Sequence, residues 1–201
     1  MEISEMYKAN LTEPIRLLNQ LFYYKSFIYV STSSVLLPNQ TFYSLSKQAC
    51  EQALKLWHDE HGGNIAIVRP SSVTGVGEQP QHLIPTLIRS CLYGEKMPFV
   101  PEPTHDFIDV SDFVKEVLFV SQHMGRYRGK ILNLGFGRSH SNQEVLKLVE
   151  EVTKRKANIK LVKSLRNYDT PEWCVDDDLP FIPKKTLRQI IKEMVEWEKN
   201  K

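Results

Sequence analysis

The sequence predicts an α/β fold in which helices flank a parallel sheet. Residues 27–31 and 65–68 are continuous β-prone runs, apolar almost throughout, which is typical of strands buried on both faces. Between them, apolar residues recur at steps of four from Leu45 to Trp57, the spacing of a helix packed on one side. This order of strand, helix and strand is the repeating unit of parallel sheets covered by helices.

The rest of the chain continues this alternation of helices and short strands. Apolar spacing and flanking residues predict helices over residues 15–22, 83–93, 111–124 and 142–153 and a strand over residues 130–134. Gly94 and Gly125 follow two of these helices, and glycine is common just past a helix end. Thr12 is placed to cap the first helix. Capping boxes at Ser141 and Thr186 open the helix at 142–153 and a further helix near the end of the sequence.

The composition is that of an ordinary soluble globular protein. The 201 residues include 26 Lys and Arg against 24 Asp and Glu, a formal charge of +2, so we expect no nucleic-acid partner. No apolar run reaches the roughly 18 residues of a transmembrane helix, so we expect no membrane association. Three widely spaced cysteines predict reduced thiols in the cytoplasm, and six histidines without a ligand spacing predict no metal site.

One pair of side chains suits acid–base chemistry. Tyr43 and Lys47 lie one helical turn apart, on the same face of the helix predicted between the two strands. A nearby cation favours the phenolate and lowers a tyrosine pKa from its usual value of about 10. Hydroxyl residues 31–34 follow the first strand, at the carboxyl end of the sheet, where open parallel sheets bind ligands. The pair and the hydroxyl cluster together predict a site at this end.

Several motifs, taken in order, resemble the extended short-chain dehydrogenases/reductases, in particular the NAD-dependent epimerases and dehydratases of nucleotide sugars. Residues 27–35 (FIYVSTSSV) resemble the strand that ends in this family's catalytic serine or threonine, and Tyr43 and Lys47 match its Y-x-x-x-K pair. The remaining matches are VRPSSVTG at 68–75, HDFIDVSD at 105–112 and NLGFG at 133–137. The resemblance implies a partial Rossmann-like parallel sheet flanked by helices, with a smaller C-terminal α+β substrate-binding part.

The resemblance also implies roles for individual residues. Tyr43 would exchange a proton with the substrate, Lys47 would lower the tyrosine pKa and bind the cofactor ribose, and Thr32 would steady the reacting oxygen. Asn10 lies where the family has an asparagine that supports a proton relay. The implied cofactor is NAD or NADP, and the implied partner is a small-molecule substrate, a nucleotide sugar. The implied cofactor contacts are Tyr43, Lys47, Arg69, Pro70, Ser72 and Val73, and the implied substrate contacts are Ser33, Ser34, Ser72, Leu83, His105 and Arg166.

Two departures from the family pattern bear on the chemistry. Ser33 and Ser34 stand where the dehydratases have an Asp-Glu pair for elimination, so dehydration is disfavoured. His105 replaces the arginine that binds the diphosphate, and a neutral imidazole is a poorer partner for an anion than a guanidinium fork. The candidate substitutes are Arg69, Arg89 and Arg166.

A third departure concerns the cofactor site as a whole. The sequence holds no G-x-x-G-x-x-G turn, the element that cradles the dinucleotide diphosphate in this family. We therefore expect residues 1–75 to form the later portion of a Rossmann-like domain that carries the catalytic Thr, Tyr and Lys. Residues 76–201 would mainly bind substrate, with residues 105–135 returning to the sheet. On this interpretation the chain alone is an incomplete, truncated enzyme.

Two other interpretations stay open at this point. In the first, the chain is a catalytically silent remnant that associates with a partner through its open strand edge. In the second, it is a reductase that takes its cofactor half from another polypeptide. Members of the family often pair through the two helices that flank the catalytic strand, here residues 11–24 and 43–61. The resemblance therefore implies a homodimer.

Overall fold

A parallel sheet of three strands forms the centre of the first part of the fold. The computed structural model describes residues 2–20, 26–164, 173–180, 182 and 184–201. The strands β1 (Phe27–Val30), β2 (Ile65–Pro70) and β6 (Ile131–Leu134) lie in the order β1-β2-β6, and all run parallel. In register, Val30 lies beside Val68, which lies beside Leu132. The predicted parallel sheet is confirmed.

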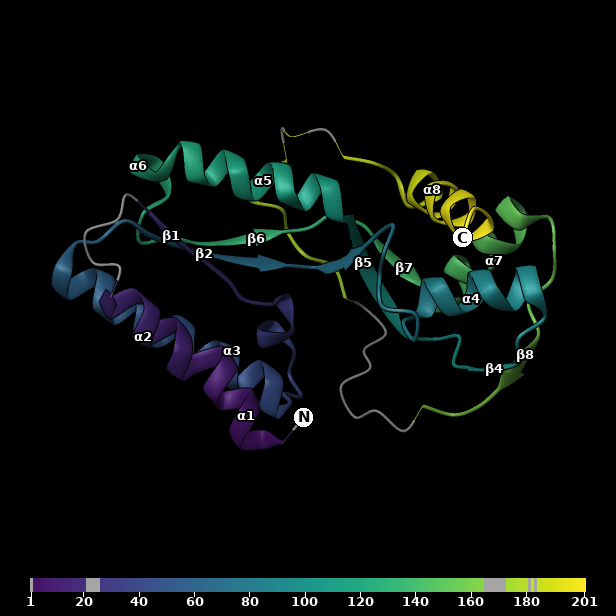
Figure 1. The fold of residues 1–201 in the computed structure, drawn as a ribbon, viewed down its shortest axis with the longest axis horizontal. Coiled ribbons are helices and arrows are strands. Elements are labelled where there is room, and N and C mark those ends of the chain that lie inside the picture. The colour runs from purple at the N-terminus through teal and green to yellow at the C-terminus, as the bar shows by residue number, and fades with distance from the viewer. Residues whose placement is uncertain (1, 21–25, 165–172, 181, 183) are drawn as a thin grey trace.

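Helices cover both faces of this sheet (Figure 1). On one face lie α2 (Glu13–Gln20) and α3 (Phe42–His61), and on the other α5 (Val110–Gln122) and α6 (Met124–Tyr127). Alternate residues of β2 serve the two faces, as a pleated strand requires. Ile65 and Ile67 join the core under α3, whereas Ala66 and Val68 join the core under α5.

The first helical segment differs from the prediction. It starts at α1 (Ile3–Tyr7), passes through a π-helical turn, η1 (Lys8–Thr12), and continues into α2. Thr12 therefore lies inside a continuous helical segment, and its predicted capping role is wrong. The physical reason is Pro14, which has no N–H to donate to the carbonyl of Asn10, so the chain widens into a π turn instead of starting afresh.

The second part of the fold packs three helices against two small sheets. Strands β3 (Ser72–Thr74), β5 (Thr104–Asp109) and β7 (Ser139–Ser141) form one sheet, with β3 and β5 parallel and β5 and β7 antiparallel. Strands β4 (Met97–Phe99) and β8 (Ile159–Leu161) form the other. The helices are α4 (Leu83–Tyr93), α7 (Asn142–Thr153) and α8 (Leu187–Lys199), and they bury a shared apolar core.

The predicted capping residues mostly hold in the structure. Ser141 and Thr186 form the capping boxes of α7 and α8, and Gly94 ends α4 in the left-handed conformation. Gly125 does not end a helix, which corrects the prediction: the break falls at His123, and Gly125 lies within α6. The strands β3, β4, β5, β7 and β8 were not predicted. Four of them, β3, β4, β7 and β8, have only three residues, too few to show a period.

Asp106 joins the two parts of the fold. Its buried carboxylate accepts hydrogen bonds from the backbone N–H groups of Phe136 and Gly137, both at 2.9 Å, and of Val175 at 3.2 Å. It thereby fixes the turn after β6 and the segment at 173–175 against β5. Burial raises the pKa of Asp106, and the three backbone N–H groups oppose the rise because they favour the carboxylate.

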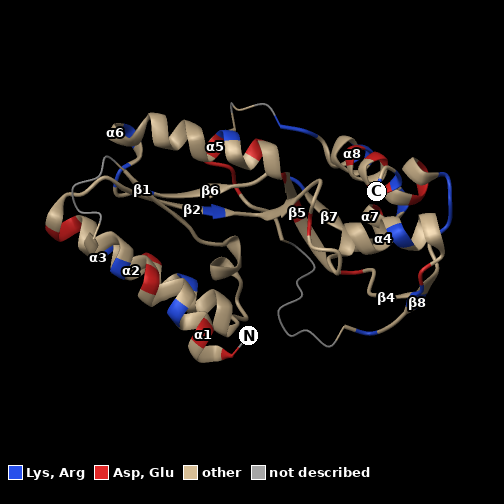
Figure 2. Ribbon diagram, in the orientation of Figure 1, with Lys and Arg blue, Asp and Glu red and all other residues tan. Residues whose placement is uncertain are grey.

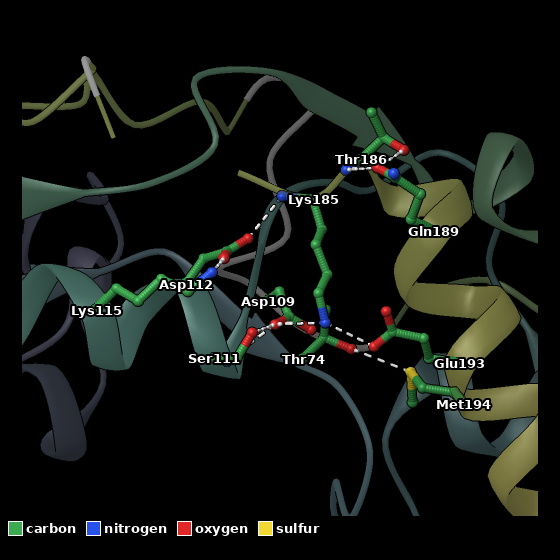
Figure 3. Close-up of polar contacts among 10 residues, drawn as sticks. All are labelled: Thr74, Asp109, Ser111, Asp112, Lys115, Lys185, Thr186, Gln189, Glu193 and Met194. Atoms are coloured by element: carbon green, nitrogen blue, oxygen red, sulfur yellow. Dashed lines mark hydrogen bonds and ion pairs between the residues drawn. The ribbon is translucent and has the colours of Figure 1, made fainter. Parts of the chain in front are cut away.

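Buried charges tie α5 to the segment that precedes α8. Figure 3 shows Lys185 between the two helices: its backbone N–H donates to Asp112 at 2.6 Å, and its ammonium lies 3.4 Å from Asp109 and 2.6 Å from Glu193. Beside it, the ammonium of Lys184 contacts both Glu116, at 2.9 Å, and Asp177. These contacts hold the C-terminal segment on the sheet and α8 on the second core.

Other charges are spread over the surface (Figure 2). Basic residues gather in the turn after α7, at Lys154, Arg155 and Lys156. Two of them are engaged locally: Arg155 donates to the carbonyl of Leu92 at 2.7 Å, and Lys156 pairs with Glu150 at 2.6 Å. In the described part of the chain, no helix combines the length and apolar character needed to cross a membrane.

Glu116→Gln tests the energetic cost of burying the Glu116 carboxylate beside Lys184. Glu116 is fully buried, and burial raises its pKa to about 7, with Lys184 opposing the rise. Its contribution to the free energy of unfolding is therefore present below the unfolded value of 4.5 and is lost as the pH rises to about 7. Since glutamine does not ionise, we expect the variant to gain stability relative to wild type over this range, by about 3 kcal/mol at most.

Urea unfolding followed by circular dichroism at about pH 4.5, 6 and 8 measures this difference. Glu193→Gln is the matched control, because Glu193 also pairs with a lysine but is exposed. A stability difference between Glu116→Gln and wild type that does not change with pH would contradict the expectation.

Candidate functional site

The site lies where β1 ends and α3 begins. Thr32 follows β1 in extended conformation and caps a short 3₁₀ turn, η2 (Ser33–Leu36). Thr41 then caps α3 through a capping box with Ser44, so the helix starts beside the end of the strand. This path places Tyr43 in the first turn of α3 and Lys47 one turn later.

The Thr32 hydroxyl lies close enough to the phenol of Tyr43 to affect its pKa. The Thr32 hydroxyl oxygen accepts from the backbone N–H of Ser34 at 3.2 Å and lies 3.0 Å from the Ser34 hydroxyl oxygen. Partial burial raises the pKa of Tyr43, and the hydrogen bond with Thr32 opposes this rise. The contact matches what the reacting end of an acid–base site requires: a second hydroxyl within reach of the phenol.

Lys47 is placed differently from the expectation. Its ammonium donates to the backbone carbonyl of Val30 at 2.9 Å, and it lies 4.9 Å from the ring centroid of Tyr29 and 6.0 Å from that of Tyr43. Burial lowers the pKa of Lys47, while the neighbouring Cys50 and Glu51 raise it. The expected lowering of the Tyr43 pKa by Lys47 is wrong for this structure, because the ammonium is turned toward β1 and burial dominates at the phenol.

Asn10 joins the site from the π turn. Its side-chain amide donates to the hydroxyl of Ser46 at 3.0 Å, and that hydroxyl donates to the backbone carbonyl of Tyr43 at 2.7 Å. Asn10 therefore reaches the first turn of α3 through one hydroxyl group. Of the residues predicted to be catalytic, the structure brings together all four: Thr32, Tyr43, Lys47 and Asn10.

Arg69 has a different place from the one predicted. Its guanidinium forms a two-pronged ion pair with the buried carboxylate of Glu51, with N–O distances of 2.9 and 2.5 Å. Separating such a pair would leave a buried charge at a cost of several kcal/mol, on the order of 3–5. Arg69 therefore serves β2 and α3 and cannot replace the missing diphosphate-binding arginine. Pro70, which follows it, ends β2 and is buried.

Two serines near the ends of β1 and β2 have no individual role predicted from the sequence, although Ser31 belongs to the predicted hydroxyl cluster at 31–34. Ser31 and Ser71 are buried, and their hydroxyl oxygens lack a hydrogen-bond partner among the described residues. Buried hydroxyl groups without partners are uncommon and fit a place where a polar ligand approaches. The signal in the sequence is that each serine follows the last residue of a buried strand. Ser33 is buried, and Ser34, Ser72 and Val73 are partly buried beyond the same strand ends.

The remaining predicted substrate residues lie in the second part of the fold. Leu83 starts α4 and packs against its core, and Arg89 on the same helix contacts Glu95 at 3.1 Å and the carbonyl of Pro80 at 2.6 Å. His105 lies on β5, with its ring 5.4 Å from that of Trp173 and 5.7 Å from that of Phe107. Arg166 lies outside the described residues.

A metal site needs several His, Cys, Asp or Glu side chains that converge on one point. Among residues 2–20, 26–164 and the described residues after 172, no group of three His, Cys, Asp or Glu side chains is arranged to hold a metal ion. Cys50 and Cys91 are buried and Cys174 is exposed, and all three are free thiols.

Comparison with known proteins gives a family match. Residues 2–135, about two thirds of the chain, match the family model described as the NAD dependent epimerase/dehydratase family. The dTDP-glucose 4,6-dehydratase of Streptomyces griseus is 26% identical over 194 residues, which cover 86% of this chain and 58% of that protein. A dTDP-glucose 4,6-dehydratase of Xanthomonas campestris is 25% identical over 178 residues, covering 77% of this chain and 48% of that protein.

Solved structures share the fold at lower identity. The UDP-glucose 4-epimerase of Thermotoga maritima, solved with UDP-glucose, has a TM-score of 0.88 at 22% identity over 99% of this chain and 72% of that one. The dTDP-glucose 4,6-dehydratase of Bacillus anthracis, solved with NAD, has a TM-score of 0.86 at 20% identity, covering 96% and 68%. This chain spans about half the length of the two curated dehydratases that it matches.

Thr32→Val tests the contact between Thr32 and the phenol of Tyr43. Because the hydrogen bond with Thr32 opposes the effect of burial, we expect its loss to raise the pKa of Tyr43 further. Tyrosine labelled with carbon-13 at Cζ, titrated by NMR and assigned with Tyr43→Phe, measures this pKa. Thr86→Val is the matched control, since that hydroxyl bonds the carbonyl of His82 on α4. An unchanged Tyr43 titration in Thr32→Val would contradict the contact.

Proposed function

Because the chain belongs to the NAD dependent epimerase/dehydratase family, we propose that it carries the acid–base and substrate-binding part of a nucleotide-sugar epimerase or reductase. The observation that carries the proposal is the convergence of Thr32, Tyr43 and Lys47 at the carboxyl end of β1. This end of an open parallel sheet is where ligands bind. The sequence predicted the position from motif order, and the geometry supports it.

The chemistry follows from the three side chains. Oxidation of a substrate alcohol breaks a C–H bond and an O–H bond, and the hydride acceptor would be supplied by NAD or NADP. The proton goes to the phenolate oxygen of Tyr43, and the reverse step returns it. The Thr32 hydroxyl donates to the same substrate oxygen as negative charge develops on it. The ammonium of Lys47, which lies 6.0 Å from the ring centroid of Tyr43, is the group we assign to the cofactor ribose.

The residues present fit only one end of such a cofactor. Tyr43, Lys47 and the two buried serine hydroxyls at the strand ends offer polar groups to a ribose and an amide. The sequence provides no glycine-rich turn for the diphosphate, and the chain spans about half the length of its curated relatives. We infer that the diphosphate is held by residues outside these 201.

The region after Thr32 supports epimerase or reductase chemistry over dehydration. The relatives from Streptomyces griseus and Xanthomonas campestris are dehydratases, yet this chain has Ser33 and Ser34 where the elimination step would need two carboxyl groups. A serine hydroxyl has no accessible pKa for general acid–base work near neutral pH. Ser33 is also buried and Ser34 is held by Thr32, so neither is placed to act as an acid or a base.

The proposed substrate is a nucleotide sugar bound between the two parts of the fold. In the described chain, His105 stands where the family has its diphosphate-binding arginine, and its ring forms an aromatic cluster with the buried Phe107 and with Trp173. We infer that this cluster contacts the substrate by ring stacking, with weaker recognition of diphosphate charge. The homodimer implied by the resemblance is part of the proposal. The exposed apolar residues on the helices beside β1 include Ile3, Leu17, Phe42, Leu45 and Leu56.

Calorimetric titration of the 201-residue chain with NAD and with NADP tests the incomplete cofactor site. We expect a dissociation constant weaker than about 1 mM for both, since only the ribose end finds partners. Binding in the micromolar range would show that these 201 residues themselves hold the diphosphate, which would contradict the inference.

Tyr43→Phe tests the proposed base in the natural polypeptide that contains these residues. We expect turnover of UDP-glucose or dTDP-glucose with NAD to fall by at least about 100-fold. Product analysis and the absorbance of the reduced cofactor measure this turnover. Cofactor binding should persist, because the phenol is not its main contact. Tyr93→Phe is the matched control, since Tyr93 is exposed at the end of α4 and bonds the carbonyl of Glu198.

Tyr43→Phe and the wild-type polypeptide together separate the competing interpretations. Equal turnover in Tyr43→Phe and wild type would overturn the assignment of the base. A wild-type polypeptide that neither turns over these sugars nor binds NAD or NADP would instead favour the non-catalytic interaction module, with association through the open edge of β1.

A further inference from the structure

Tyr29 lies next to the proposed site, and no role has been assigned to it so far. It is the third residue of β1, and only 5% of its surface is exposed. Its side chain packs in the core between β1 and α3, with Cys50 and Leu54. One end of this side chain reaches the π turn and its ring faces the ammonium of Lys47. A residue that only filled the core would need neither contact.

The hydroxyl of Tyr29 satisfies a carbonyl that the helix cannot satisfy. It donates to the backbone oxygen of Asn10 at 2.7 Å. In a regular helix that oxygen would accept from the N–H of residue 14, which is Pro14 and has none. Burial raises the pKa of Tyr29, so the phenol keeps its proton and remains a donor. The tyrosine therefore completes the π turn from which Asn10 reaches Ser46.

The ring of Tyr29 holds the charge of Lys47. The ammonium lies 4.9 Å from the ring centroid, within the range of a cation–π contact, and donates to the carbonyl of Val30. Other groups that face Lys47 are the ring of Tyr43 and, by charge, Cys50 and Glu51. Burial disfavours the ammonium, so contacts that favour it decide where Nζ lies.

We propose that Tyr29 is a positioning residue that fixes Asn10 through its hydroxyl and Lys47 through its ring, from beneath the sheet end. The proposal rests on the proposed function, since the positions of Lys47 and Asn10 bear on the chemistry only if this end of the sheet is an acid–base site. Tyr29 touches no substrate and no reacting atom. Its two contacts are separable, because phenylalanine keeps the ring and loses the hydroxyl, whereas leucine loses both.

The test measures Lys47 and the π turn directly and needs no turnover. Lysines of the 201-residue chain are methylated with carbon-13 formaldehyde, the Lys47 signal is assigned with Lys47→Arg, and its pKa is determined by NMR. We expect Tyr29→Leu to lower the pKa of Lys47 by about half a unit or more, roughly a threefold loss in proton affinity. Tyr29→Phe should leave it within about 0.2 unit of wild type, since the aromatic face remains.

Hydrogen exchange reports the other contact. We expect backbone amides of residues 11–13 to exchange about fivefold faster in both Tyr29→Phe and Tyr29→Leu, because each loses the hydrogen bond to Asn10. Tyr127→Leu is the matched control: Tyr127 is also a buried tyrosine, but it packs under α5 on the other face of the sheet. It should change neither reading.

The outcomes decide the proposal whether or not the protein is an enzyme. A Lys47 titration in Tyr29→Leu equal to wild type, or one shifted equally in Tyr29→Phe, would overturn the role of the ring. Unchanged exchange at residues 11–13 in Tyr29→Phe would overturn the role of the hydroxyl. If Tyr29→Leu does not fold, Tyr29→Met removes the aromatic face with a longer apolar side chain and gives the same comparison. Loss of the proposed function alone would leave both readings unaffected.

Discussion

The parallel pairing of β1 with β2 fixes where every residue of the site lies. With Phe27 beside Ile65 and Val30 beside Val68, β1 ends near the carboxyl end of the sheet, two residues before β2 ends at Pro70. The chain must then turn back over this end to enter α3, because a parallel neighbour is reached only by a crossover on one face. That return brings Tyr43 next to Thr32 and, one helical turn later, Lys47 next to the strand.

The same constraint explains why buried charge gathers away from the site. The crossover helix α3 presents Glu51 to β2, where Arg69 neutralises it, and α5 presents Glu116 to Lys184. Both carboxylates lie within the layers, where burial disfavours an unpaired ion. The site itself, at the strand ends, carries hydroxyl groups and one ammonium. Ion pairs within the layers thus hold the elements together, and neutral hydroxyls line the carboxyl end of the sheet.

Much of this could be predicted from the sequence, and the limits have physical causes. The strands β1 and β2 and the helix α3 follow from long apolar patterns, and Tyr43 and Lys47 follow from their spacing of four. The ion pair of Arg69 could not be predicted, because it joins residues 18 apart whose separation depends on the crossover. The π turn was missed because a proline near a helix start ordinarily marks its first turn, and only the full helical segment shows that the chain begins earlier.

The orientation of Lys47 shows how the edge of the sheet enters the chemistry. The N–H groups of Phe27 and Ser31 donate to carbonyls at Asn64 and Val68 beside β2, so the alternating residues Ile28 and Val30 turn their backbone groups away from it. In the described chain β1 pairs with no second strand, and the carbonyl of Val30 would lack a donor there. Lys47 supplies one, as lysines commonly do at sheet edges. An ammonium engaged in this way stabilises the strand more than the phenolate, which is why Tyr43 and Lys47, although one helical turn apart, do not yet behave electrostatically as a pair.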